Sequence, residues 1–155
     1  MAISQSTSYD EMSRVMTMVC KTAAKAVHRY AEVSGLTPGW DMPEPFITGY
    51  IFDRLNLPDV SMTLESNFKK LWDWNEHGHQ RQRSRPAPKR DKNERVDLAL
   101  FKGNSEDPGD HPFFALIEFK RFKLNPRDRE KLLGVFKHID TCPWGAICSV
   151  LLIVA

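Results

Sequence analysis

The sequence predicts one α/β domain built on a mixed β-sheet. Its 155 residues, 41% hydrophobic and 27% charged, have the size and composition of a single globular domain. Apolar residues recur at helical spacing in some segments and alternate with period two in others. The expected order is helix, helix, strand, long loop, strand, strand, helix, strand, with no internal repeat.

The N-terminal part of the chain shows two helix patterns. Ser8 and Glu11 fit a capping box, the apolar residues that follow recur at helical spacing, and Gly35 can end the helix. A second helix is expected to start near Pro45, since proline suits the first turn, and Pro58 stops it.

Four segments are expected to be strands because they alternate or are continuously apolar. They are residues 60–65, 95–102, 113–122 and 146–155. The chain therefore ends on a strand that we expect to be central and fully buried. Residues 68–74 fit either a hairpin or a helical turn.

Two local patterns refine this prediction. In the strand over 95–102, period two puts Val96, Leu98 and Leu100 on one face and Asp97, Ala99 and Phe101 on the other. Further along, Asn125 is expected to cap a helix that has Pro126 at its first position.

Residues 76–94 are predicted to form a long basic loop, because they are polar and contain two prolines. Residues 80–95 carry seven basic and two acidic side chains, a net charge of +5 in a chain of net charge +2. This charge suits an anionic partner such as nucleic acid, and it suits a solvated connector equally well. The candidate phosphate contacts are Arg81, Arg83, Arg85, Lys89 and Arg90.

The cysteine content and the apolar runs indicate the compartment. Cys20, Cys142 and Cys148 are an odd number without paired spacing, which favours a reduced, cytoplasmic environment. The longest apolar run, residues 150–155, is far shorter than the roughly 20 residues of a membrane span. Residues 1–11 lack the features of a signal peptide. We therefore expect no membrane association.

Two acids interrupt apolar strand patterns, Asp97 in one strand and Glu118 in the next. An unpaired buried carboxylate costs several kcal/mol, so each needs a partner, a cation or a solvent-filled cleft. Period two puts Glu118 and Lys120 on one face, and Asp97 can join them if the strands are neighbours. Two carboxylates are typical of a magnesium site, and a nearby lysine can orient water or stabilise charge.

Simpler roles are open for the same residues. Glu118 and Lys120 can form a same-face ion pair on an edge strand. Asp97 can bridge to Arg95 or to the basic loop. Glu44 stands at a predicted helix start, where the helix dipole favours an acid.

Asp97 followed by Glu118-Phe119-Lys120 resembles the signature of the PD-(D/E)XK nuclease superfamily. The order of elements over residues 41–155 is similar to that family's restriction-endonuclease-like core, to which the first helix is an addition. The proline that precedes the aspartate in the family is absent, and Val96 stands in its place.

The resemblance implies a magnesium-dependent endonuclease that hydrolyses phosphodiester bonds, most simply in DNA, with Mn²⁺ as a substitute metal. Asp97, Glu118 and the backbone carbonyl of Phe119 would bind the metal, Lys120 would serve the attacking water, and Glu44 would assist. Asp128 and Lys131 resemble a polar helix face beside the site.

The alternative is an inactive nuclease-fold module that binds nucleic acid or a protein partner. A homodimer is left open.

Overall fold

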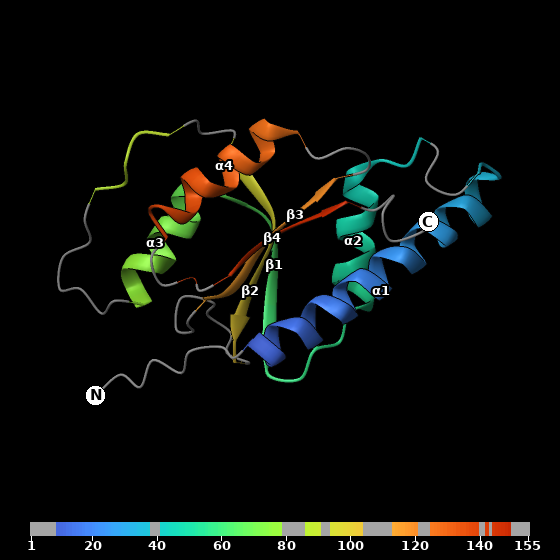
Figure 1. The fold of residues 1–155 in the computed structure, drawn as a ribbon, viewed down its shortest axis with the longest axis horizontal. Coiled ribbons are helices and arrows are strands. Elements are labelled where there is room, and N and C mark those ends of the chain that lie inside the picture. The colour runs from blue at the N-terminus through green and yellow to red at the C-terminus, as the bar shows by residue number, and fades with distance from the viewer. Residues whose placement is uncertain are drawn as a thin grey trace.

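The fold is taken from a computed structural model. The structure describes residues 9–37, 41–78, 86–90, 94–103, 113–120, 125–139, 142 and 144–149. In this part of the chain, a β-sheet lies between two layers of helices (Figure 1).

The sheet is mixed, as predicted. Its strands are β1 (Val60–Asn67), β2 (Arg95–Lys102), β3 (Phe113–Lys120) and β4 (Gly145–Ser149), in the spatial order β1-β2-β3-β4. β1 pairs with β2 and β2 with β3 in antiparallel fashion, whereas β3 and β4 are parallel. The start of β2 and the end of β3 therefore lie at the same edge of the sheet.

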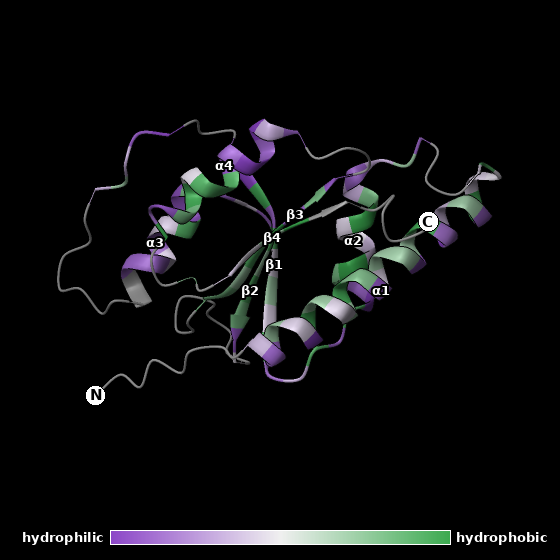
Figure 2. Cartoon of the chain, viewed as in Figure 1, coloured by the Kyte–Doolittle hydropathy of each residue, from purple (hydrophilic) through white to green (hydrophobic). Residues whose placement is uncertain are grey.

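Within the described residues, helices cover both faces of the sheet (Figure 1). α1 (Tyr9–Ser34) and α2 (Glu44–Arg54) lie on one side, and α3 (Phe68–Gly78) and α4 (Pro126–Phe136) lie on the other. Figure 2 shows hydrophobic residues along β2 and β3, whereas the N-terminal end of α4 is hydrophilic.

The two helix patterns of the N-terminal part are confirmed. Gly35, at φ +71°, donates its N–H to the carbonyl of Ala31 at 2.9 Å and so ends α1. α2 begins at Glu44 with Pro43 as its N-cap, one residue before the predicted Pro45. Ser8 lies outside the described residues.

The sheet separates two hydrophobic cores. Leu98, Leu100 and Ile117 pack with α1 and α2, whereas Phe101 and Leu116 belong to the core with α3 and α4. Since helices cover both faces, β2 and β3 have few polar positions. Each large side chain buried in this way contributes about 1.5–3 kcal/mol.

The ambiguous segment after β1 is helical, and its helix is longer than that segment. Asn67 Oδ1 accepts the N–H of Lys70 at 2.9 Å and caps the first turn of α3. Phe68 and Trp72 are buried in the second core. α3 continues to Gly78, so the prediction that the loop begins at residue 76 was wrong by three residues.

The predicted faces of β2 are confirmed from Leu98 to Phe101, and the prediction for Val96 was wrong. Val96 packs in the core that contains Ala99 and Phe101, not with Leu98 and Leu100. The alternation is interrupted at Asp97, next to the point where Glu65 of β1 adopts a φ of +45°.

The last strand begins at Gly145, one residue before the predicted strand, and within the described residues it lies at the end of the strand order and is less buried than the predicted central strand. Within β4, Gly145 is exposed, and Ala146 and Ile147 are half-buried, because β3 is the one described strand that pairs with β4. Residues 150–155 lie outside the described residues, as do residues 121–122 of the strand predicted over 113–122. No described helix has the length and apolar character needed to cross a lipid bilayer.

Candidate metal centre

The predicted acids and lysines meet at one edge of the sheet, where β2 starts and β3 ends. The register pairs Leu98 with Ile117, so the next position along brings Asp97 beside Glu118. α4 starts at the same edge. Its N-cap Asn125 accepts the N–H of Arg127 at 3.0 Å, and this cap fixes where the polar residues of α4 stand.

Asp97 is held by the backbone of the neighbouring strand. Its Oδ2 accepts the N–H of Phe119 at 2.7 Å. A side-chain oxygen of β2 thus accepts a hydrogen bond that a backbone carbonyl would ordinarily accept between paired strands. Burial raises the pKa of Asp97, and the bond from Phe119 opposes this rise. The alternative bridge to Arg95 is not formed, because Arg95 Nη1 pairs with Glu65 Oε2 at 3.1 Å.

Glu118 is fully buried, with a relative exposure of 0%. Its Oε1 lies 2.5 Å from Nζ of Lys131 in an ion pair. Its Oε2 has no hydrogen-bond partner within the described part of the chain. Burial first, and then the charge of Asp97, raise the pKa of Glu118 to about 7. Once it is ionised, Glu118 is a buried anion that requires a cation beside it.

Lys120 contacts two other carboxylates. Its Nζ lies 3.5 Å from Asp128 Oδ1 and 3.7 Å from Glu44 Oε2. Burial disfavours the ammonium form, but the surrounding carboxylates, led by Glu44, raise the pKa of Lys120 above its ordinary value. Lys120 is therefore protonated at neutral pH and acts as a hydrogen-bond donor, not as a base.

The helix residues Asp128 and Lys131 both reach the site, one turn apart on α4. Lys131 Nζ also donates to the carbonyl of Arg95 at 2.9 Å. The family resemblance implied that these two residues form a polar helix face beside the site. It did not indicate that Lys131, and not Lys120, forms the ion pair with Glu118.

The charges of the site do not balance. Four carboxylates and two lysines meet here, so the net charge is −2 when all six are ionised. No group of three or more His, Cys, Asp or Glu side chains among the described residues is arranged to hold a metal ion. Magnesium, however, uses one or two carboxylates and fills its remaining positions with water and phosphate. The pair Asp97 and Glu118, with an unpartnered Glu118 oxygen, fits such an ion.

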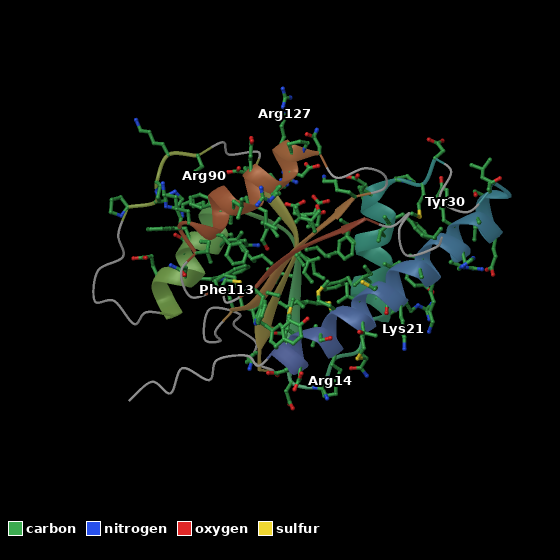
Figure 3. The ribbon with its side chains drawn as sticks, viewed as in Figure 1. Arg14, Lys21, Tyr30, Arg90, Phe113 and Arg127 are labelled. Carbon is green, nitrogen blue, oxygen red and sulfur yellow. The ribbon has the colours of Figure 1, made fainter. Side chains whose placement is uncertain are left out.

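The predicted phosphate contacts divide into three groups. Lys89 is exposed. Arg90 forms a bidentate ion pair with Glu94, through Nε at 2.5 Å and Nη2 at 2.7 Å, and its guanidinium lies 5.3 Å from the ring centre of Phe68. Figure 3 shows Arg90 beside α3 and α4. To bind phosphate, Arg90 would have to leave these contacts. Arg81, Arg83 and Arg85 lie outside the described residues.

No model of a protein family, no curated protein and no solved structure matches this chain.

Proposed function

We propose that this chain is a magnesium-dependent hydrolase of phosphodiester bonds with a restriction-endonuclease-like core, most simply a DNA endonuclease. The observation that supports it is Glu118, a fully buried carboxylate with an unpartnered oxygen beside a second carboxylate. Burying such a group costs several kcal/mol unless a cation compensates its charge. A divalent cation would also offset the negative charge of these carboxylates.

Asp97, Glu118 and the backbone carbonyl of Phe119 would hold the metal. A bound divalent cation supplies Lewis acidity and lowers the pKa of a coordinated water. The hydrogen bond from Phe119 keeps the carboxylate of Asp97 in place before any ligand binds.

Lys120 is the candidate catalytic lysine. As an ammonium group, it can donate to the attacking water or to a phosphate oxygen and stabilise the negative charge that develops there. Glu44 and Asp128 hold the ammonium from two helices. This arrangement supports positioning and charge stabilisation by Lys120 and leaves proton abstraction to another group.

The second candidate is an inactive nuclease-fold module that binds nucleic acid or a protein partner. The ion pair between Glu118 and Lys131 favours it, because the chain itself already supplies this carboxylate with one cation.

Metal titration combined with a cleavage assay separates the two candidates. Mn²⁺ binding is measured by calorimetry, and cleavage is measured on supercoiled plasmid and on labelled duplex DNA. We expect metal binding and metal-dependent cleavage by the parent protein, and loss of both in Asp97→Asn, since a neutral amide is a poorer ligand for a hard cation. The matched control is Asp73→Asn on the exposed side of α3, where Asp73 pairs with Lys69. A parent protein that binds nucleic acid without cleaving it at any metal concentration would support the inactive module.

A further inference from the structure

Lys131 of α4 contacts a buried acid of the site, although it is not a proposed catalytic group. Its Nζ lies 2.5 Å from the Oε1 of Glu118, and it also donates to the carbonyl of Arg95 at 2.9 Å. The side chain of Lys131 is 25% exposed, whereas that of Glu118 is fully buried. A cation on a flexible stem thus reaches from the surface of α4 into the buried end of the site.

The ammonium group compensates only part of the site's negative charge. One oxygen of Glu118 has no hydrogen-bond partner in the described residues. Asp97 accepts a neutral backbone N–H, and Lys120 lies between Glu44 and Asp128. The pair Asp97 and Glu118 together with Lys131 therefore keeps a net charge of −1 when all three are ionised.

A metal held by Glu118 would compete directly with Lys131. Both are cations that need the same buried carboxylate, and two cations on one carboxylate repel each other strongly where solvent is excluded. The partly exposed lysine can withdraw to water, because its charged head needs only a small movement along its flexible stem to become hydrated.

We propose that Lys131 is a resident counter-ion of the metal centre, which occupies Glu118 in the metal-free protein and is displaced when a divalent cation binds. This inference rests on the proposed metal site. In this arrangement Lys131 stabilises the metal-free fold and lowers the affinity for metal, so it regulates how much free cation the site requires.

The test measures Mn²⁺ affinity by calorimetry and thermal unfolding with a chelator, in the parent protein and in Lys131→Met. We expect Lys131→Met to bind Mn²⁺ roughly 10-fold more tightly, a typical coupling between two competing ligands. In chelator, the melting temperature of Lys131→Met should be lower than that of the parent protein. Added Mn²⁺ should raise the melting temperature of the variant by more than that of the parent. The control is Lys137→Met, which removes the same charge at an exposed position just after α4.

Two further measurements keep the test decisive if Lys131→Met folds poorly. Lys131→Gln keeps a donor for the Arg95 carbonyl without the charge, and it should also bind Mn²⁺ more tightly. In the parent protein, acylation of Lys131 followed by mass spectrometry should become faster when Mn²⁺ is added, while acylation of Lys137 should not change.

The outcomes distinguish this inference from the proposed function. Unchanged or weaker Mn²⁺ binding by the Lys131 variants, with unchanged acylation in the parent, would overturn the counter-ion role and leave the metal site intact. Absence of Mn²⁺ binding by the parent and all variants would overturn both.

Discussion

Two lysines lie among four carboxylates at one edge of the sheet, and their neighbours differ. Lys120 contacts Glu44 and Asp128, which come from two helices. Lys131 contacts Glu118, the most buried acid of the site. The two ammonium groups should therefore affect different measurements, Lys120 the rate of the proposed cleavage and Lys131 the affinity of the proposed site for metal.

Replacing Lys120 separates catalysis from binding. Lys120→Ala leaves Asp97 and Glu118 in place, so Mn²⁺ and DNA should still bind. Cleavage should fall by roughly 10² or more, since the variant lacks a group that stabilises developing charge. Single-turnover cleavage and calorimetry measure the two effects. Unchanged cleavage in Lys120→Ala would show that Lys120 is a structural partner of Glu44 and Asp128 alone.

Glu118 should make the metal-free fold dependent on pH. Its pKa is raised to about 7 in the folded protein, above the ordinary value of 4.5, so the folded state binds more protons between these values. Stability in chelator should then fall as pH rises through this window, by up to about 3 kcal/mol. Urea unfolding at several pH values measures this slope, and Glu118→Gln should flatten it. If the stability of the parent protein rose with pH in this window more steeply than that of Glu118→Gln, the raised pKa could not belong to Glu118.

The sequence could predict which side chains of the candidate site come together, but it could not predict how they pair. Asp97 and Glu118 were recognisable because acids interrupt apolar strands, and period two placed Lys120 with Glu118. Which lysine reaches Glu118 depends on how α4 packs against the sheet. A same-face neighbour two residues away was the obvious partner, yet Lys131 on α4 takes that place.

At the scale of elements, the sequence predicted helix boundaries accurately where the boundary residue strongly prefers one backbone conformation. Gly35 ends α1, and Asn125 with Pro126 starts α4, as predicted. The boundary between α3 and the basic loop was missed because polar residues 76–78 continue the helix. The side of the sheet on which Val96 lies was predicted wrongly because the backbone of the neighbouring strand β1 deviates at Glu65. Nothing in the sequence of β2 indicates this deviation.

Two glycines provide a test of the packing between elements. At Gly145, the first residue of β4, an added Cβ would overlap the ring of Phe136 from α4. Gly145→Ala should therefore destabilise the protein by about 1–3 kcal/mol, as overpacking does. Chemical unfolding measures this change.

The matched control is Gly49→Ala in α2. An added Cβ there has no neighbour within 4 Å, so the variant should gain up to about 1 kcal/mol from helix propensity. Equal effects of the two substitutions would mean that β4 and α4 are not packed as closely as described.

At the scale of the whole molecule, the charge is unevenly distributed. The chain carries a net +2, whereas residues 80–95 carry +5. Within that segment, Arg90 is bound to Glu94 and lies over Phe68, so one end of the basic segment is attached to α3. This attachment occupies Arg90, so the other cations of the segment are the better candidates for phosphate contacts.

The basic segment should account for much of the salt dependence of nucleic-acid binding. In the triple variant of Arg81, Arg83 and Arg85 to alanine, affinity should fall and the slope of log K against log salt should become shallower. Removing one phosphate contact should reduce that slope by about 0.9 for duplex DNA, because fewer counterions are released. Fluorescence anisotropy with a labelled duplex at several salt concentrations measures both quantities.

A second triple variant separates local contacts from net charge. Arg14, Arg29 and Arg54 are exposed on α1 and α2, and Figure 3 shows Arg14 on the outer side of α1. Replacing these three with alanine changes the net charge by the same amount, yet the slope should stay close to that of the parent. If both triple variants change the slope equally, the overall charge of the molecule governs binding and the basic segment has no particular role. A shallower slope in the first variant alone would place the phosphate contacts on residues 81–85.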